Sequence, residues 1–352
     1  MLAYLHIPFC DSKCPYCAFN SYDNKQSLKI AYMKAITSQL SFELERFEIK
    51  KQSIDSLFIG GGTPSTIACS LYAPFFDILR PYLSAKAEIT SEANPHSASK
   101  EWLEGMYTLG VNRLSFGVQS FDEKKLHFLG RNHTPKMAKD AINTAASIGF
   151  KNLSLDLIYG TSMDTFKRLK EDLDTAATLP INHLSAYALT VEENTPFFTK
   201  TRVVNSSERL AKKFVQAIKD KGFAQYEISN FGTYQSIHNK GYWEQKNYLG
   251  IGSGAVGFFN NQRFYPSKEV ETYIQDPLDK RVEALSAEDL HAEKIFLGLR
   301  SCVGIPFSHF TPKEHEKVKI LLEETKLTCN KNVVYNPDYF ISDEIALYLS
   351  LP

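Results

Sequence analysis

The sequence lacks an excess of charge of either sign. Its 352 residues contain 40 basic and 40 acidic side chains, so the formal net charge is zero. Proteins that bind nucleic acid usually carry a basic excess or stripe, because contacts to phosphate dominate their affinity. We therefore expect no nucleic-acid partner.

The chain also lacks a long apolar run. It contains no stretch of about 18 consecutive apolar residues, which a membrane-spanning helix would need. Residues 1–9 contain no basic region followed by an apolar segment, so we expect no signal peptide. These features predict a cytoplasmic protein without a transmembrane segment, and they leave room for peripheral membrane association.

Cysteine is scarce and unevenly distributed. Three of the six cysteines, Cys10, Cys14 and Cys17, lie within eight residues, and the others are scattered. A disulfide scaffold for a chain of this length would need more cysteines at more even spacing. The pattern indicates a protein of a reducing compartment with one local cluster of thiols.

Apolar residues make up 43% of the sequence, which is enough for a sizeable core. Short apolar or alternating runs predict strands at 2–7, 54–59, 88–94, 113–119, 153–159 and 183–189. The segments between them predict helices at 27–47, 70–83, 101–109, 135–147 and 164–179. Such alternation implies parallel strands joined by right-handed crossovers. We expect an α/β fold in which residues 1–200 form a partial (β/α)6 barrel, with a doubly wound sheet as the alternative.

After about residue 200 the alternation weakens. A helix is predicted at 206–221, a short strand at 226–229 and a glycine-rich segment at 250–257. Two more helices, at 286–299 and 311–325, precede a strand near 332–334 and a terminal helix. We expect residues 201–352 to form a smaller C-terminal α+β domain.

One face of several predicted strands is polar. Glu88 and Glu92 alternate with apolar neighbours in the third strand, and Asp156 does so in the fifth. A closed eight-stranded barrel fills its interior with branched apolar side chains. Polar, acidic inner faces instead predict a lumen that holds a ligand; solvent-exposed strand edges are the alternative.

Cys10, Cys14 and Cys17 form a C-x3-C-x2-C run directly after the first predicted strand. Thiolates at this spacing can converge on one metal centre from a short loop. Three cysteines leave one iron of a cubane iron–sulfur cluster without a protein ligand, and an open position is typical of a catalytic or ligand-binding site. The alternatives are a structural zinc site completed by Cys69 or His238, and three unrelated thiols.

Three consecutive glycines, 60–62, followed by Thr63 and Pro64, end the second predicted strand. Adjacent glycines let a ligand approach the backbone closely. The segment is no phosphate-binding P-loop, because the Gly-Lys-Ser/Thr of that motif is missing. For this motif alone, a plain tight turn is the alternative.

Taken together, the motifs resemble those of the radical S-adenosylmethionine superfamily, in the branch that contains the oxygen-independent coproporphyrinogen III oxidases. The likeness covers roughly residues 2–200 and implies a partial (β/α)6 barrel with the cluster loop at its top. It rests on Tyr4-x-His6-x-Pro8-Phe9-Cys10 with the cysteine run, Gly60-Gly-Gly-Thr-Pro64, Glu92-Ala-Asn-Pro95, Gly117-Val-Gln119-Ser-Phe121, Gly130-Arg131 and Asp156-Leu-Ile-Tyr-Gly160.

The resemblance implies that Cys10, Cys14 and Cys17 ligate a [4Fe–4S] cluster whose open iron takes the amino and carboxylate groups of S-adenosylmethionine. It implies further contacts to this cofactor from Tyr4, Tyr16, Gly61, Gly62, Thr63, Glu92, Gln119, Arg131 and Asp156. Independently, a ligand that joins an amino acid to a sugar needs a carboxylate, a cation and acceptors for a diol. The polar strand faces supply groups of these kinds.

Two departures separate the chain from the oxidases. Phe19 occupies the position of a further cysteine, and the first predicted strand begins at Leu2 without the longer segment that precedes it in the oxidases. Both features match the HemW-like haem chaperones, which implies a protein that binds haem and transfers it to acceptor proteins. The alternative is radical decarboxylation of coproporphyrinogen III to protoporphyrinogen IX, so whether the chain is an enzyme stays open. Radical modification of a nucleic acid or protein is a third class, which the neutral charge disfavours.

A second motif, His238-Asn-Lys-Gly-Tyr242-Trp243, matches the H-N-x-x-Y-W pattern of these chaperones. A histidine flanked by aromatic residues can offer haem iron an axial nitrogen and offer the porphyrin faces on which to stack. The alternative is that these residues only pack between domains. The resemblance favours haem as their ligand.

Overall fold

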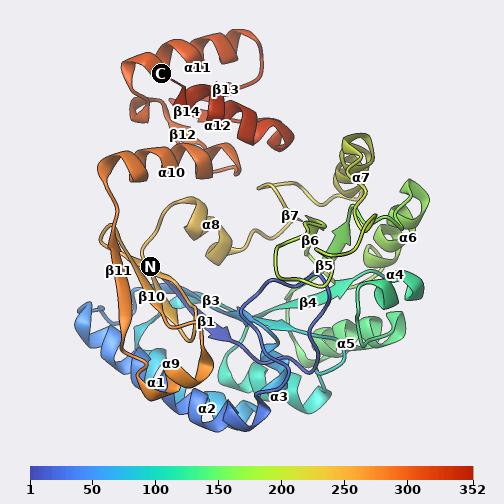
Figure 1. Ribbon diagram of the computed structural model, residues 1–352, viewed down its shortest axis with the longest axis vertical. Coiled ribbons are helices and arrows are strands. Elements are labelled where there is room, and N and C mark those ends of the chain that lie inside the picture. Colours follow the sequence, from blue (N-terminus) through green and yellow to red (C-terminus); the bar gives the residue numbers. More distant parts are fainter. Residues whose placement is uncertain (352) are drawn as a thin grey trace.

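The computed structural model describes residues 1–351. Six parallel strands follow one another in chain order within one sheet (Figure 1). This order confirms the predicted β/α architecture and differs from a doubly wound sheet, whose strand order reverses. The strands are β1 (Leu2–Ile7), β2 (Ile54–Gly61), β3 (Leu83–Ala93), β4 (Arg113–Gln119), β5 (Asn152–Tyr159) and β6 (His183–Ala188).

Helices that connect these strands pack against the outer face of the sheet (Figure 1). Their ends follow from local chemistry. For example, the Ser99 hydroxyl accepts a hydrogen bond from the Trp102 N–H at the start of α3, and Gly110, with φ +107°, ends it. The helices are α1 (Lys29–Arg46), α2 (Cys69–Leu79), α3 (Lys100–Leu109), α4 (Glu123–Phe128), α5 (Pro135–Ile148) and α6 (Phe166–Ala176). A further helix, α7 (Glu208–Asp220), follows β6 and packs against α6.

The same sheet continues beyond residue 200. β8 (Tyr248–Ile251) pairs in parallel with β1, and β7 (Asn230–Gly232) pairs antiparallel with β6. Within residues 1–351, β7 and β11 are the two edges of an eleven-stranded sheet, so the barrel is open. The expected division between residues 200 and 201 thus falls inside the sheet. The remaining strands of the sheet are β9 (Gly257–Phe259), β10 (Gln262–Pro266) and β11 (Lys280–Ala284). The helices α8 (Ile237–Trp243) and α9 (Val270–Gln275) lie in the same part of the chain.

The last part of the chain has a hydrophobic core of its own, which includes Leu299, Val334 and Leu349. In Figure 1 this part is drawn in orange and red and stands beside the open barrel. It contains α10 (Ala287–Leu299), β12 (Ile305–Pro306), α11 (Pro312–Glu323), β13 (Thr328–Asn330), β14 (Val333–Tyr335) and α12 (Ser342–Ser350). No helix of residues 1–351 combines the length and the apolar character needed to cross a bilayer.

The predicted strand at 226–229 is wrong. This segment forms one isolated bridge, which joins Glu227 to Ser301. The Ile228 N–H donates to the Arg300 carbonyl, so the backbone finds its partner in a segment about 70 residues away along the chain. A local pattern of apolar residues does not show such a partner, and the strand itself, β7, lies immediately after the segment.

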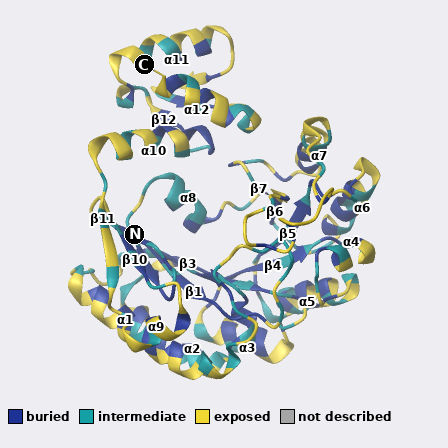
Figure 2. Cartoon of the chain, viewed as in Figure 1, coloured by how far each residue is buried: buried dark blue, intermediate teal, exposed yellow. Residues whose placement is uncertain are grey.

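The inward faces of the parallel strands are polar, as the alternation predicts, but most of these side chains are buried (Figure 2). Glu88 and Arg113 are each only 2% exposed, and Thr90 and Ser154 are fully buried. Buried polar groups persist in folded proteins when they are hydrogen-bonded. The lumen therefore contains a network of polar side chains in addition to a space for a ligand.

Candidate functional site

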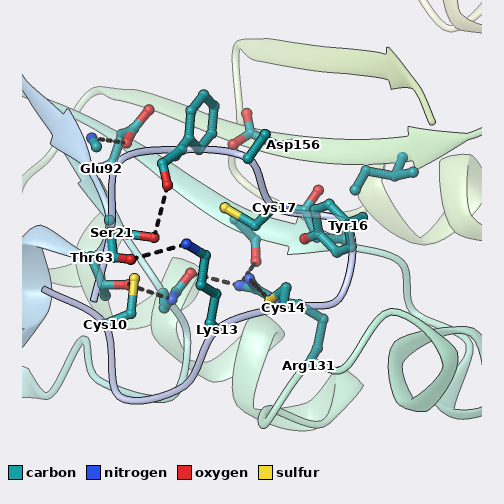
Figure 3. Close-up of a pocket in the computed structure, with 18 of the residues that line it drawn as sticks. Cys10, Lys13, Cys14, Tyr16, Cys17, Ser21, Thr63, Glu92, Arg131 and Asp156 are labelled. Atoms are coloured by element: carbon teal, nitrogen blue, oxygen red, sulfur yellow. Dashed lines mark hydrogen bonds between the residues drawn. The ribbon is translucent and has the colours of Figure 1, made fainter. Parts of the chain in front are cut away.

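A cavity of about 440 Å³ lies where the parallel strands reach their carboxyl ends. Cys10, Cys14 and Cys17 line it together, and so do residues at the ends of β2 to β6 (Figure 3). This edge of a β/α fold is where ligands usually bind, because the loops after the strands converge there. We call this space the cysteine cavity.

The loop that carries the cysteines is folded back on itself. The Cys10 N–H donates to the Tyr22 carbonyl at 3.0 Å, and the Cys17 N–H donates to the Cys14 carbonyl at 3.1 Å. Burial raises the pKa of both the Cys10 and the Cys17 thiol. A bound metal centre would reverse this effect, because coordination deprotonates a thiol.

The three thiols line one cavity without forming a site for a single metal ion. No three His, Cys, Asp or Glu side chains within residues 1–351 lie close enough to hold one metal ion. A cubane cluster is larger than an ion, so its sulfur ligands stand further apart around one cavity. The residues considered for completing a zinc site lie elsewhere: the Cys69 thiol donates to the Trp102 carbonyl at 3.3 Å, and His238 is buried at α8.

Glycine is required at two positions beside Cys10. Gly61 has φ +111°, and a Cβ there would lie 2.5 Å from the His6 ring. A Cβ at Gly62 would lie 2.9 Å from the Cys10 sulfur. The Gly61 N–H donates to Glu92 Oε2 at 3.1 Å. Glycine is therefore needed here because His6 and Cys10 approach the backbone too closely for a Cβ atom, whereas a plain turn would not require this.

Two carboxyl groups from different strands face the cysteine cavity (Figure 3). Burial, reinforced by the nearby Asp156, raises the pKa of Glu92 to about 8. Burial also raises the pKa of Asp156, which accepts a hydrogen bond from Ser115 Oγ at 3.2 Å. A cationic ligand would favour the ionised form of Glu92, so the pair is suited to a ligand that carries an ammonium group.

Arg131 crosses the cavity wall and is held by several acceptors. Its Nη2 donates to Asn94 Oδ1 and to the Gly117 carbonyl, each at 2.6 Å, and its Nη1 approaches the Cys14 sulfur at 3.5 Å. Asn94 in turn donates to Thr63 Oγ1 at 3.0 Å. Asn94 was not among the predicted cofactor residues, although it lies within the Glu-Ala-Asn-Pro motif that carried the resemblance.

Eight of the nine predicted cofactor residues line the cysteine cavity: Tyr16, Gly61, Gly62, Thr63, Glu92, Gln119, Arg131 and Asp156. Gln119 has φ +68°, an uncommon conformation outside glycine that often marks a functional site. Tyr4 is the ninth, and it does not belong to the lining. Its hydroxyl bonds to His6 Nδ1 at 2.9 Å and its ring packs on Phe58.

One part of the cavity lining was not predicted from the sequence. It contains Tyr187 at the end of β6, together with Thr190 and Glu192 of the following loop. Lys13, within the cysteine run, also lines the cavity. No motif marked the residues after β6, since their place at the cavity depends on where that strand ends.

His238 lies in an enclosed network. Its Nδ1 is 2.8 Å from Ser56 Oγ, its Nε2 is 2.9 Å from Tyr242 Oη, and only 1% of the residue is exposed. Burial lowers the pKa of His238 to about 3. The carboxylate of Glu88 accepts hydrogen bonds from the N–H groups of Ile237 and His238, which secures the start of α8.

None of the three residues predicted to bind haem lines the cysteine cavity. His238 has both ring nitrogens engaged, Tyr242 holds one of them, and Trp243 is the half-buried last residue of α8. The α8 segment and the cysteine cavity are therefore two distinct places in the fold.

Comparison with known proteins places this geometry in context. The sequence pattern of the Radical SAM superfamily matches residues 4–176. The chain is 32% identical to the haem chaperone HemW of Bacillus subtilis, over 99% of this chain and 94% of that protein. It is 38% identical to HemW of Escherichia coli, over 72% of this chain and 69% of that protein.

A solved structure shares the fold. The coproporphyrinogen III oxidase HemN of Escherichia coli, a radical SAM enzyme, superimposes with a TM-score of 0.84 and covers 99% of this chain and 89% of that one. Its sequence identity is 20%, so the likeness concerns the fold alone. Identity and coverage together show that the chain belongs to the radical SAM superfamily, among the HemW-like proteins.

Proposed function

We propose that this protein is a cytoplasmic haem chaperone: it binds a [4Fe–4S] cluster, S-adenosylmethionine and haem, and it passes the haem to acceptor proteins. Two similar proteins, whose alignments cover 99% and 95% of the chain, are haem chaperones by name. The observation that carries the proposal is the cysteine cavity, which is lined by three thiols, by the carboxyl groups of Glu92 and Asp156 and by the Arg131 guanidinium. All six cysteines are free, which suits a reducing compartment.

Cys10, Cys14 and Cys17 would hold the cluster, which supplies an electron to the sulfonium of S-adenosylmethionine when both are bound. Glu92 would accept from the ammonium group of the cofactor, and Arg131 would donate to its carboxylate. The remaining contacts would come from Tyr16, Gly61, Gly62 and Thr63 around the methionyl part and from Gln119 and Asp156 at the ribose. Tyr4 would have an indirect role, because its hydroxyl bonds to His6 Nδ1 and neither residue lines the cavity.

The competing function is oxidation of coproporphyrinogen III. Phe19 lines the cysteine cavity and is 69% exposed, at the position where the oxidases that the sequence resembles carry a further cysteine. A phenylalanine has neither a sulfur to bind metal nor a group that transfers protons. We therefore place haem delivery ahead of decarboxylation.

The test begins with anaerobic reconstitution of the cluster and titration with haem, followed by gel filtration. We expect saturation near one haem per chain. A small amount of the loaded protein should then accelerate haem uptake by a panel of apo-haemoproteins, compared with haem offered on serum albumin. No acceleration for any acceptor, together with turnover of coproporphyrinogen, would contradict the proposal and favour the oxidase.

A further inference from the structure

A second cavity, of about 360 Å³, lies between α8, the strands β8 to β10 and α10. Its walls include Tyr242, Tyr248, Phe258 and Phe296, and the charged pair Arg263 and Glu293 lies at the same place. We call it the α8–α10 cleft. It shares no lining residue with the cysteine cavity.

The aromatic rings of the cleft form a continuous series. Tyr242 and Tyr248 meet edge to face with ring centroids 4.7 Å apart, and Tyr248 lies 6.1 Å from Phe258. Phe296, on α10, is 46% exposed. Tyr242 and Tyr248 are half-buried and Phe258 is buried, so these rings line a partly enclosed space. A pocket with mainly aromatic walls is typical of a site for an apolar ligand.

His238 does not reach this cleft as a free ligand. Both of its ring nitrogens are engaged inside the barrel, and one of them holds the Tyr242 hydroxyl. Of the residues in the H-N-x-x-Y-W motif, only Tyr242 lines the cleft. The motif therefore contributes one lining residue, Tyr242, and the hydrogen bond from His238 fixes the orientation of its side chain.

The Tyr248 hydroxyl is the group in the cleft that remains available. It makes no hydrogen bond within residues 1–351, whereas Tyr242 is bonded to His238 and the neighbouring Tyr265 is bonded to Glu283. Burial raises the pKa of Tyr248; the positive charge of Arg263 opposes that rise, and the negative charge of Glu293, its ion-pair partner, adds to it. Coordination to a ferric ion would itself favour the phenolate.

We infer that the α8–α10 cleft is the haem site and that Tyr248 Oη is the ligand to ferric iron; this inference rests on the proposed function. The phenol releases its proton to solvent, and the phenolate oxygen donates an electron pair to Fe(III), with no change of oxidation state. Tyrosinate is a known axial ligand of haem. The cleft is small for a ligand pocket, so one edge of the porphyrin would stay exposed, as suits a cargo that is handed on.

The test compares ferric haem binding by the full-length, cluster-reconstituted protein and three variants. We expect the wild type to show the absorbance and electron paramagnetic resonance of high-spin ferric haem with a tyrosinate ligand. Tyr248→Phe should lose that signature and bind about tenfold more weakly, a change of about 1.4 kcal/mol. Tyr265→Phe changes a tyrosine of the nearby strand β10 whose hydroxyl donates to Glu283, so this variant is the matched control and should behave as the wild type.

A third variant guards against a folding defect in Tyr248→Phe. Phe296→Glu changes an exposed side chain of the cleft, so it should fold normally and still bind haem about tenfold more weakly. If the wild type binds one haem and Tyr248→Phe keeps the same spectrum and affinity, the inference is wrong and the proposed function stands. If the wild type binds no haem, both fail.

Discussion

The cysteine cavity and the α8 segment are both rich in polar groups, but these groups face an open space in the cavity and are hydrogen-bonded to one another at α8. In the cavity, thiols, carboxyl groups and the Arg131 guanidinium surround a space of about 440 Å³, and the buried Arg131 Nε has no partner within residues 1–351. At α8, His238 and Glu88 are bonded on every side by other side chains and backbone groups. Groups left facing a space indicate a ligand, whereas groups that bond each other indicate support of the fold.

The largest effect should come from removing a thiol of the cysteine cavity. Cys14→Ser deletes one of three expected cluster ligands, so we expect bound iron and sulfide to fall about tenfold or more after anaerobic reconstitution. Iron analysis and visible absorbance measure this. Cys69→Ser, which changes a half-buried thiol between α2 and α3, should keep the cluster. An equal loss of bound iron in both variants would contradict the assignment of the cluster to Cys10, Cys14 and Cys17.

The next effect concerns stability at low pH. The pKa of His238 is about 3 in the folded chain against an ordinary value of 6.5, so the unfolded chain takes up a proton first as the pH falls. Stability is therefore present above pH 6.5 and lost below it, by up to about 3 kcal/mol at pH 4 from this residue.

Urea unfolding between pH 7 and pH 4 measures this loss. His238→Gln should be less stable than the wild type at pH 7, because Ser56 and Tyr242 lose their partner, and its stability should depend less steeply on pH. His96→Gln changes an exposed histidine and serves as the control. An equal slope in the wild type and His238→Gln would show that His238 is not an enclosed structural residue.

A third effect concerns the pH dependence of S-adenosylmethionine binding at the Glu92 carboxyl of the cysteine cavity. The Glu92 carboxyl has a pKa of about 8 and must lose its proton before it pairs with an ammonium group. We expect the affinity for S-adenosylmethionine to rise between pH 6 and pH 8 by up to about tenfold per unit. Anaerobic calorimetry measures it. Glu92→Gln should bind more weakly with a flatter profile, and an unchanged slope in that variant would rule out this role.

The smallest effect is expected at Tyr4, which the resemblance places beside the cofactor and the structure places on His6, outside the cavity lining. Tyr4→Phe removes one hydrogen bond, so stability should fall by about 1 kcal/mol. Equilibrium binding should show an affinity for S-adenosylmethionine that changes by less than about threefold, a fraction of the roughly 1.4 kcal/mol that a tenfold change represents. A larger loss would mean that Tyr4 contacts the cofactor directly.

Much of the barrel was predictable because its signals are local. The bounds of β1 and β4 agree with the predicted strands, since alternation and flanking turn residues define them within a few positions. Eight of the nine residues predicted to contact the cofactor line the cysteine cavity, because each of the eight belongs to a recognisable motif in the segments that surround it.

The rest depends on contacts between distant segments. The pairing of β8 with β1 joins residues about 245 positions apart, and no local pattern indicates it. The same holds for the α8–α10 cleft, where Tyr248 and Phe296 meet only because α10 packs beside α8. The motif marks His238, but its hydrogen bond to Ser56 joins residues 182 positions apart, which no local pattern indicates.

On the proposals above, the cysteine cavity and the haem site are separate. One measurement tests it directly: titration of ferric haem into cluster-reconstituted protein, with and without saturating S-adenosylmethionine. If haem binds at the α8–α10 cleft, its affinity should agree within about twofold in the two titrations, a difference below about 0.5 kcal/mol. If S-adenosylmethionine excludes haem or weakens it tenfold or more, haem occupies the cysteine cavity and the account of two sites is wrong.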